Sequence, residues 1–288
     1  MKIYSWNFIN KLPIQDELIL CVGSFETLHL GHYELFKIAK SLKAMHSEKK
    51  MAIMIFQSPV KNGKVQNKKA LQPKARLYTL AELGFDYAFV IDLNEEIMNM
   101  DYHMFIKALI DNHVTDVVCG PDFRYGFNRM GTIDKLKKHF NVSIADERKV
   151  NKRKISSTLI NELIAEGNIN GMNELLLQNY AFITNMDHFE YAYPENLNRL
   201  RSGIYIVNAV IDGFEYHGIT LINLIKKTDE EDNAQNNMLY LFDLQIVPSK
   251  YQEIYIEFLH TIRYINNERE NSINENDLEI GRNFFIKK

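Results

Sequence analysis

The sequence has 288 residues, of which 46% are hydrophobic and 25% are charged. This length fits one large domain or two of ordinary size, and the apolar content is too high for a mainly disordered chain. The formal net charge of −3 gives no indication of a nucleic-acid partner or of binding to an anionic membrane surface.

The two cysteines, Cys21 and Cys119, predict neither a disulfide framework nor a metal site. They lie far apart in the sequence, each within an apolar run, so we expect both to be buried as small hydrophobic side chains. The N-terminal residues lack the apolar core of a signal peptide, and no apolar stretch approaches the roughly 18 residues of a membrane span. We therefore expect a cytoplasmic protein that does not enter a membrane.

The first 180 residues alternate between short apolar runs and segments with helical periodicity. The runs, typical of buried strands, are Leu18–Val22, Met51–Phe56, Tyr87–Ile91, Asp116–Gly120 and Val142–Ala145. The expected helices are His32–Met45, Pro73–Leu83, Met104–Ile110, Ile133–Phe140, Ser157–Glu166 and Met172–Leu177. This alternation predicts an α/β fold with a parallel, Rossmann-like sheet and helices on both of its faces.

After about Tyr180 the pattern changes to long strands. They are expected at Gly203–Ile211, Phe214–Ile225, Met238–Val247 and Tyr251–Arg263. Asp212-Gly213 predicts a type I′ hairpin turn, the polar segment Lys226–Asn237 a solvated loop, and the residues after Asn276 a helix. We therefore expect two domains, residues 1–178 and residues 179–288, the second being a small antiparallel β-barrel.

The segment Gly23-Ser24-Phe25-Glu26-Thr27-Leu28-His29-Leu30-Gly31-His32 joins the first expected strand to the first expected helix. Unpaired N–H groups and the positive end of the helix dipole favour an anion at such a point. Two histidines three residues apart can both face one phosphate, and Gly31 lets the backbone approach closely. For this composition, His-x-Gly-His is expected by chance about 0.01 times. The structural alternative is a helix start with one capping histidine.

His29-Leu30-Gly31-His32 resembles the HxGH signature of the nucleotidyltransferase superfamily. Gly120–Gly131 is similar to the GxDFRFGxxRxG block of bacterial FAD synthetases, the RibF family. Ile155-Ser156-Ser157-Thr158, followed by Glu166-Gly167-Asn168, resembles that family's ISSTxIR…AEGD segment. The blocks occur in family order and at family spacing, so the resemblance implies an FMN adenylyltransferase that makes FAD and pyrophosphate from FMN and ATP.

The resemblance also implies roles for these residues. His29 and His32 would contact the ATP phosphates near solvent and stabilise the transition state. The other expected ATP-binding residues are Gly23, Ser24, Phe25, Gly31, Ser156, Ser157 and Thr158. The expected nucleotide and flavin pocket comprises Gly120, Asp122, Phe123, Arg124 and Arg129. Mg²⁺ would bridge ATP oxygens, with no metal site assigned to the protein itself. As alternatives, Arg124 and Arg129 pair with surface acids, residues 156–158 only cap a helix, and Lys152–Lys154 is a solvated basic run.

Three departures from the family pattern lie in this first part. Asn161 stands where the ISSTxIR block has arginine, and a lysine of the Lys152–Lys154 run could compensate for that missing cation. The family's FxPHP-like segment becomes Phe56-Gln57-Ser58-Pro59-Val60 and lacks its histidine. Glu26-Thr27 replaces an acidic residue followed by glycine.

The second domain resembles the riboflavin kinase barrel of the family in its strands but not in its chemistry. Ser202–Val207 and Leu239–Leu244 resemble family strands. Tyr180–Tyr193 contains no glycine, the PTAN motif becomes Pro194-Glu195-Asn196, and Met238 stands at the expected catalytic glutamate. We therefore expect a degenerate kinase domain. The alternatives are a bifunctional riboflavin kinase/FAD synthetase and a non-catalytic flavin- or nucleotide-binding protein; the sequence does not predict the oligomeric state.

Overall fold

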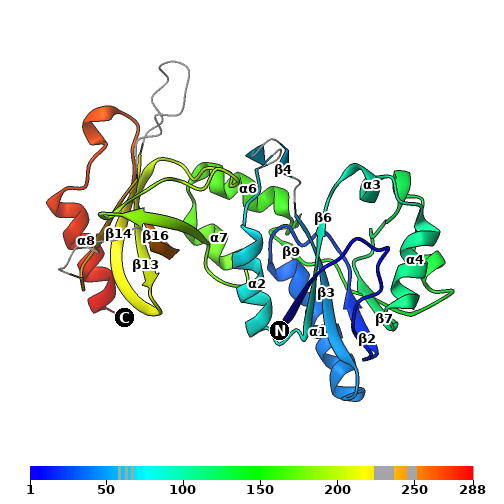
Figure 1. Cartoon of the computed structure of the whole chain (residues 1–288). Coiled ribbons are helices and arrows are strands. Elements are labelled where there is room, and N and C mark those ends of the chain that lie inside the picture. The colour runs from blue at the N-terminus through cyan, green and yellow to red at the C-terminus, as the bar shows by residue number, and fades with distance from the viewer. Residues whose placement is uncertain (58–59, 62–63, 66–67, 224–236, 245–251, 288) are drawn as a thin grey trace. The chain divides into compact units, whose positions relative to one another are not determined.

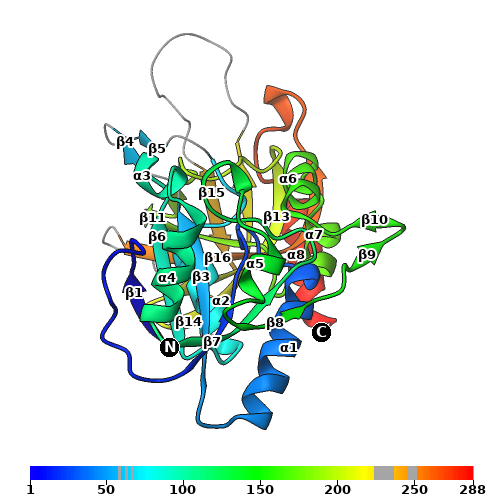
Figure 2. The same cartoon turned by 90° about the vertical axis from the view of Figure 1, so that its right-hand side faces the viewer.

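The structure, a computed structural model, describes residues 1–57, 60–61, 64–65, 68–223, 237–244 and 252–287. It forms two compact units. The first contains Met1–Asn67 and Arg76–Ser156, and the second contains Lys68–Ala75 and Ser157–Lys288. In Figures 1 and 2 most of the first unit is coloured blue to green and most of the second green to red.

A six-stranded sheet, in which every strand is parallel to its neighbours, forms the centre of the first unit (Figure 1). Its strand order is β1-β6-β3-β2-β7-β8. The strands are β1 (Lys2–Ser5), β2 (Leu18–Cys21), β3 (Lys50–Gln57), β6 (Tyr87–Asp92), β7 (Val114–Cys119) and β8 (Asn141–Ile144). The predicted parallel α/β sheet is confirmed, and all five predicted apolar runs contribute strands to it.

Helices cover both faces of this sheet, as predicted. Leu18 and Leu20 of β2 share a core with Phe105 and Leu109 of α4 (Tyr102–Asp111). The alternate residues of β2, which include the buried Cys21, point to the other face, where α1 (Leu30–Met45) packs. The remaining elements of this part are α2 (Pro73–Glu82), α3 (Glu95–Met98), η1 (Phe127–Arg129), α5 (Ile133–Leu136) and the short strands β4 (Val60–Lys61), β5 (Lys64–Val65), β9 (Lys149–Val150) and β10 (Arg153–Lys154).

Strand β1 and the end of helix α5 differ from the sequence prediction. Strand β1 was not predicted, because it lies at the sheet edge and three of its four residues are exposed, which leaves no apolar run. The helix expected over Ile133–Phe140 ends at Leu136, and a turn follows in which the N–H of Phe140 donates to the Leu136 carbonyl. The early end brings Phe140 into the core and lets the chain enter β8.

The second unit contains a closed antiparallel barrel with the strand order β11-β12-β15-β14-β13-β16, which confirms the predicted β-barrel. The strands are β11 (Ala181–Asp187), β12 (Glu190–Tyr191), β13 (Gly203–Ile211), β14 (Phe214–Ile222), β15 (Asn237–Leu241) and β16 (Gln252–Tyr264). Helices α6 (Ser157–Glu166), α7 (Ile169–Leu175), η2 (Glu268–Glu270) and α8 (Glu275–Ile286) complete it. Asp212 and Gly213 have φ of 51° and 83°, as a type I′ turn requires.

Aromatic side chains fill the barrel interior. Phe182, Tyr205 and Phe258 are fully buried, and the rings of Phe182 and Phe258 are 5.2 Å apart. On the outside, α8 packs against β14, where Ile219 and Leu221 belong to one core cluster with Phe284 and Phe285. No helix in the described ranges is both long and apolar enough to cross a membrane.

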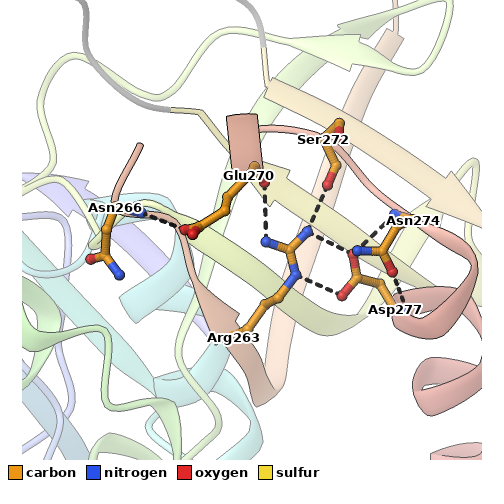
Figure 3. Close-up of polar contacts among 6 residues, drawn as sticks. All are labelled: Arg263, Asn266, Glu270, Ser272, Asn274 and Asp277. Atoms are coloured by element: carbon orange, nitrogen blue, oxygen red, sulfur yellow. Dashed lines mark hydrogen bonds and ion pairs between the residues drawn. The ribbon is translucent and has the colours of Figure 1, made fainter. Parts of the chain in front are cut away.

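Arg263 of β16 fixes the segment that leads into α8 (Figure 3). Its guanidinium donates to both carboxylate oxygens of Asp277 at 2.8 Å and to the backbone carbonyls of Glu270 and Ser272. Asp277 also accepts a hydrogen bond from the backbone N–H of Asn274, completing a capping box at the start of α8.

The strand predicted over Met238–Val247 ends at Leu241, because Phe242 and Asp243 form a bend. Asn237, expected in a solvated loop, is buried in β15, where its side chain accepts a hydrogen bond from Asn223 N–H. The rest of that predicted loop, residues 226–236, and the predicted strand ends at Ile225 and Val247 lie outside the described residues.

Candidate active site

The candidate site begins where β2 leads into α1. His29 is the N-cap residue of α1, with φ −114° and ψ 168°, and its Nδ1 accepts a hydrogen bond from the His32 backbone N–H at 3.3 Å. An accepting Nδ1 assigns the ring proton to Nε2 in the neutral imidazole. His29 therefore caps the helix, as the structural alternative required, and it keeps a second ring nitrogen that can donate a hydrogen bond.

The His29 and His32 rings form one stacked pair, 3.8 Å apart and 13° from parallel. The His32 ring also packs against Phe25, and its Nδ1 is buried without a hydrogen-bond partner in the described part of the chain. A Cβ atom on Gly31 would lie 3.0 Å from the His29 ring, so a larger residue there would push that ring away. The spacing of the motif therefore places two imidazole rings in contact at the start of the helix.

Burial keeps both rings uncharged in the ligand-free protein. It lowers the pKa of His29 to about 4 and the pKa of His32 well below its usual range. The neighbouring histidine adds to the effect at His32, and the positive charge of Lys154 adds to it at both rings. The expectation that both histidines lie near solvent is wrong for His29, which is 5% exposed.

The loop before the histidines combines a buried residue, Phe25, with an exposed one, Ser24. Phe25 has a left-handed backbone, with φ 41°, and its fully buried ring lies under Gly23, where a Cβ atom would be 3.1 Å from the ring. Ser24 is exposed. Of the expected ATP-binding residues in this loop, Ser24 is exposed and Gly23 is half-buried. The Phe25 side chain is a packing group, so only its backbone is available to a ligand.

The 155–158 segment is split between the two units. The Ile155 carbonyl lies 3.4 Å from the position of a Cβ on Gly31, so Ile155 runs beside the start of α1, and Ser156 is the last residue of the first unit. Ser157 and the exposed Thr158 begin α6 in the second unit, and their part in phosphate binding stays a prediction. Asn161 of α6, at the position of the missing arginine, accepts a hydrogen bond from the Asn198 side chain at 2.6 Å.

Lys154 differs from Lys152 of the predicted basic run in its contacts. Its Nζ is 2.9 Å from a carboxylate oxygen of Asp122 and 2.9 Å from one of Glu147, which raise its pKa. Lys152 instead lies at the turn between β9 and β10, exposed and with a left-handed φ of 66°. Since the Lys154 charge acts on both histidines, the structure brings this lysine and Asp122 to the histidine site.

The loop Gly120–Gly131 follows β7, as predicted, and is closed by two backbone hydrogen bonds between Tyr125 and Gly131. Its predicted pocket residues differ in their surroundings. Phe123 is half-buried with its ring beside that of Tyr125, and Gly120 lies next to the Asp122 carboxylate. Arg124 and Arg129 are exposed, and neither forms an ion pair with a carboxylate of the described residues. Their roles stay predictions.

Sequence reasoning missed Arg76 of α2. Its side chain is 2% exposed and donates to the Phe25 carbonyl at 2.7 Å. A single arginine in an amphipathic helical pattern gives no signal of such a contact, which joins residues 51 positions apart in the sequence. The described residues include no group of three or more His, Cys, Asp or Glu side chains that could hold a metal ion.

Comparisons with known proteins find similar sequences over most of the chain. A family model described as FAD synthetase matches residues 11–159. The chain is 26% identical over 305 residues to a protein of Buchnera aphidicola named bifunctional riboflavin kinase/FMN adenylyltransferase, covering 97% of each. A protein of the same name from Listeria monocytogenes is also 26% identical, over 88% of this chain and 82% of that protein.

A solved structure also matches most of the chain. The crystal structure of a macrolide-efflux protein from Streptococcus pneumoniae has a TM-score of 0.74 and 20% sequence identity, and the match covers 90% of this chain and 98% of that one. At this level of identity the likeness shows the fold alone.

Proposed function

Because the chain belongs to the FAD synthetase family, we propose that the stacked histidine pair at the start of α1 is where AMP passes from ATP to FMN. The observation that carries the proposal is the pair itself, a buried His29 imidazole and a half-buried His32 imidazole, both uncharged. They lie at the positive end of a 16-residue helix, inside the segment that matches the family. Such a place favours a phosphate, because helix N–H groups and ring N–H groups can both donate to it.

The reaction is a single displacement at phosphorus. A phosphate oxygen of FMN forms a bond to the α-phosphorus of ATP, the bond from that phosphorus to the bridging oxygen of the β-phosphate breaks, and pyrophosphate leaves with the electron pair. FAD is the other product. The protein contributes alignment of the two substrates and stabilisation of the charge that grows on the phosphoryl oxygens.

His29 and His32 are the catalytic residues of this proposal. The Nε2–H of His29 donates to an oxygen of the triphosphate, and His32 lies against His29 on the helix side. A bound polyanion raises the pKa of a neighbouring imidazole, so ATP itself increases the positive character of the site when it binds. The imidazoles, neutral without ATP, thus become more positive and complement the negative phosphates when ATP is bound.

Residues around the pair hold the nucleotide. We assign the backbone of Gly23, Phe25 and Gly31 and the hydroxyls of Ser24, Ser156, Ser157 and Thr158 to the ATP phosphates. Lys154 takes the place of the cation missing at Asn161, since its charge already acts on both histidines. Mg²⁺ would accompany ATP and neutralise part of its phosphate charge, since hard cations prefer oxygen ligands.

The Gly120–Gly131 loop forms the remaining pocket for the nucleotide and flavin, through Gly120, Asp122, Phe123, Arg124 and Arg129. Residues 1–178 carry adenylyl transfer in this assignment, and residues 179–288 form a barrel of the riboflavin kinase type. ATP and FMN are the small-molecule partners. Since ATP is the nucleotidyl donor, we place the reaction in the cytoplasm.

We further propose that the barrel has lost kinase activity. Met238, at the expected catalytic glutamate, is 43% exposed on β15 and carries no group that could accept a proton. In the Pro194-Glu195-Asn196 segment, the Asn196 carbonyl accepts a hydrogen bond from the Lys69 N–H. The opposing observation is that relatives covering nearly the whole chain are named bifunctional, which favours a kinase whose motifs have shifted.

Product analysis of the purified chain tests both assignments. With MgATP and FMN we expect FAD and pyrophosphate in equal amounts, and with MgATP and riboflavin we expect no FMN. Binding of ATP and FMN without pyrophosphate release would instead indicate a non-catalytic binding protein. Formation of FMN from riboflavin, abolished by Asn196→Ala, would show that the barrel is an active kinase.

A further inference from the structure

Arg76 joins the loop after β2 to the end of strand β3. Its Nη1 donates to the carbonyl of Phe25 at 2.7 Å, and its Nη2 donates to the carbonyl of Phe56 at 3.1 Å. Phe25 follows β2 and Phe56 lies near the end of β3, and these strands are adjacent and parallel. One guanidinium therefore ties the loop after β2, which leads to the histidine pair, to the carboxyl end of the neighbouring strand β3.

The charge of Arg76 is buried, and within the described part of the chain no carboxylate forms an ion pair with it. The side chain is 2% exposed, and its Nε has no hydrogen-bond partner among the described residues. Burial lowers the pKa of the guanidinium to about 10, although Glu26 acts in the opposite direction, so the group stays charged near neutral pH. A buried cation with only carbonyl partners is costly, and a site that receives a polyanion supplies the negative charge that it lacks.

The same contact fixes the wall of the histidine site. Phe25 has the left-handed φ of 41°, which a phenylalanine seldom adopts without support from its surroundings. Its ring lies 4.9 Å from the His32 ring and 5.7 Å from that of Phe36. Arg76 holds the Phe25 carbonyl, so it constrains the residue against which His32 packs.

We propose that Arg76 is a positioning residue for adenylyl transfer, with two separable effects. Its positive charge, buried behind the Gly23–Thr27 loop, strengthens binding of the ATP phosphates. Its hydrogen bonds to the Phe25 and Phe56 carbonyls hold Phe25 in place. Because His32 packs against Phe25, they also hold His32 in the geometry that the transfer needs. This inference rests on the proposed function of the histidine pair.

Two substitutions separate the effects. Arg76→Gln keeps a hydrogen-bond donor but removes the charge, and we expect the Kd for MgATP, measured by calorimetry without FMN, to rise about 10- to 100-fold. Arg76→Lys keeps the charge but cannot reproduce the planar fork. We expect its Kd for MgATP to stay within about threefold of wild type while kcat for FAD formation falls about tenfold or more.

Arg199 provides a matched control in the barrel. Its guanidinium also has a buried Nε without a partner in the described residues and donates to one backbone carbonyl, that of Asn223, at 2.9 Å. Arg199→Gln should leave both the Kd for MgATP and kcat unchanged. Circular dichroism and the unfolding temperature of each variant verify that the variant is folded.

The outcomes distinguish this inference from the function on which it rests. If the wild-type chain binds no MgATP or forms no FAD, the proposed function fails. If the wild type is active but Arg76→Gln binds MgATP as tightly as wild type, the charge effect is absent and the inference is wrong. Should Arg76→Gln not fold, Arg76→Lys decides: retained binding with reduced kcat supports the inference, and unchanged kcat overturns it.

Discussion

The His29 and His32 rings are stacked with their centroids 3.8 Å apart, closer than two charged imidazolium groups could lie without strong repulsion. The pair is therefore stable in the ligand-free protein only in its neutral form, which burial also favours. A triphosphate changes this balance, because its negative charge offsets the repulsion between the rings. One structural relationship thus links nucleotide binding, catalysis and the pH dependence of stability.

Removing either imidazole should impair catalysis. We expect His29→Gln and His32→Gln to lower kcat for FAD formation by roughly 10²–10³, the usual effect of losing one electrostatic stabiliser of a transition state. Glutamine limits the cavity that alanine would leave at these buried positions. The rate is measured as pyrophosphate release at saturating ATP and FMN. His46→Gln, at the exposed C-cap residue of α1, is the control. Normal turnover in His32→Gln would remove the catalytic role of the pair.

Stability should depend on pH through His29. Its pKa is about 4 in the folded protein, whereas an unfolded histidine titrates near 6.5. Between these values the unfolded chain binds the extra proton, so the free energy of unfolding decreases as pH falls from about 6.5 toward 4. The contribution of this residue is at most about 3–4 kcal/mol.

Urea unfolding at pH 7 and pH 5 measures this effect. His29→Gln should reduce the difference in unfolding free energy between the two pH values, whereas His46→Gln, at an exposed position, should leave it unchanged. An equal pH difference in wild type and His29→Gln would mean that other groups account for the acid sensitivity.

The strands and the histidine motif could be predicted because their signals are local. Buried parallel strands appear as continuous apolar runs, and the His29–His32 block has a fixed spacing at a strand-to-helix junction. Arg76 and Lys154 could not be placed in this way. The role of Arg76 depends on carbonyls of Phe25 and Phe56, and that of Lys154 on Asp122, contacts that only the tertiary structure brings about.

Local rules also gave wrong boundaries where packing decides. The helical pattern after Ile133 continues beyond Leu136, yet the helix ends there because Phe140 enters the core. Asn237 reads as a loop residue in a polar segment, but its side chain is buried and satisfied by the backbone of Asn223. Neither the end of α5 nor the burial of Asn237 follows from local sequence propensity alone.

Lys154 should matter for ATP and Lys152 should not. Lys154→Met removes a cation that acts on the histidine pair and leaves the Asp122 and Glu147 carboxylates unpaired, so it should raise the KM for ATP about 5- to 50-fold and the KM for FMN much less. Lys152→Met, at the exposed turn, is the matched control. Equal effects on both substrates, or none, would identify the run as a solvated basic surface.

If Lys154 compensates for the cation missing at residue 161, an arginine at residue 161 should not reduce the activity. Asn161→Arg should leave kcat/KM for ATP unchanged or raise it, and it should reduce the loss caused by Lys154→Met in the double variant. The substitution removes the hydrogen bond that Asn161 accepts from Asn198, which can lower stability. The unfolding temperature of Asn161→Arg is therefore measured in parallel. A double variant as impaired as Lys154→Met alone would contradict compensation.

The attachment of α8 should depend on the charge of Asp277. This carboxylate is fully buried, accepts hydrogen bonds from Nε and Nη2 of Arg263 and caps the helix through Asn274 (Figure 3). Asp277→Asn keeps the size but removes the charge and half of the accepting capacity, leaving the Arg263 cation without its anion. We expect the free energy of unfolding to fall by about 2–4 kcal/mol and amide protection to be lost first in α8. Hydrogen exchange and urea unfolding measure both, with Glu279→Gln, at an exposed position of the same helix, as the control. If both variants have wild-type stability and α8 stays protected, the aromatic contacts of Phe284 and Phe285 hold the helix without the ion pair.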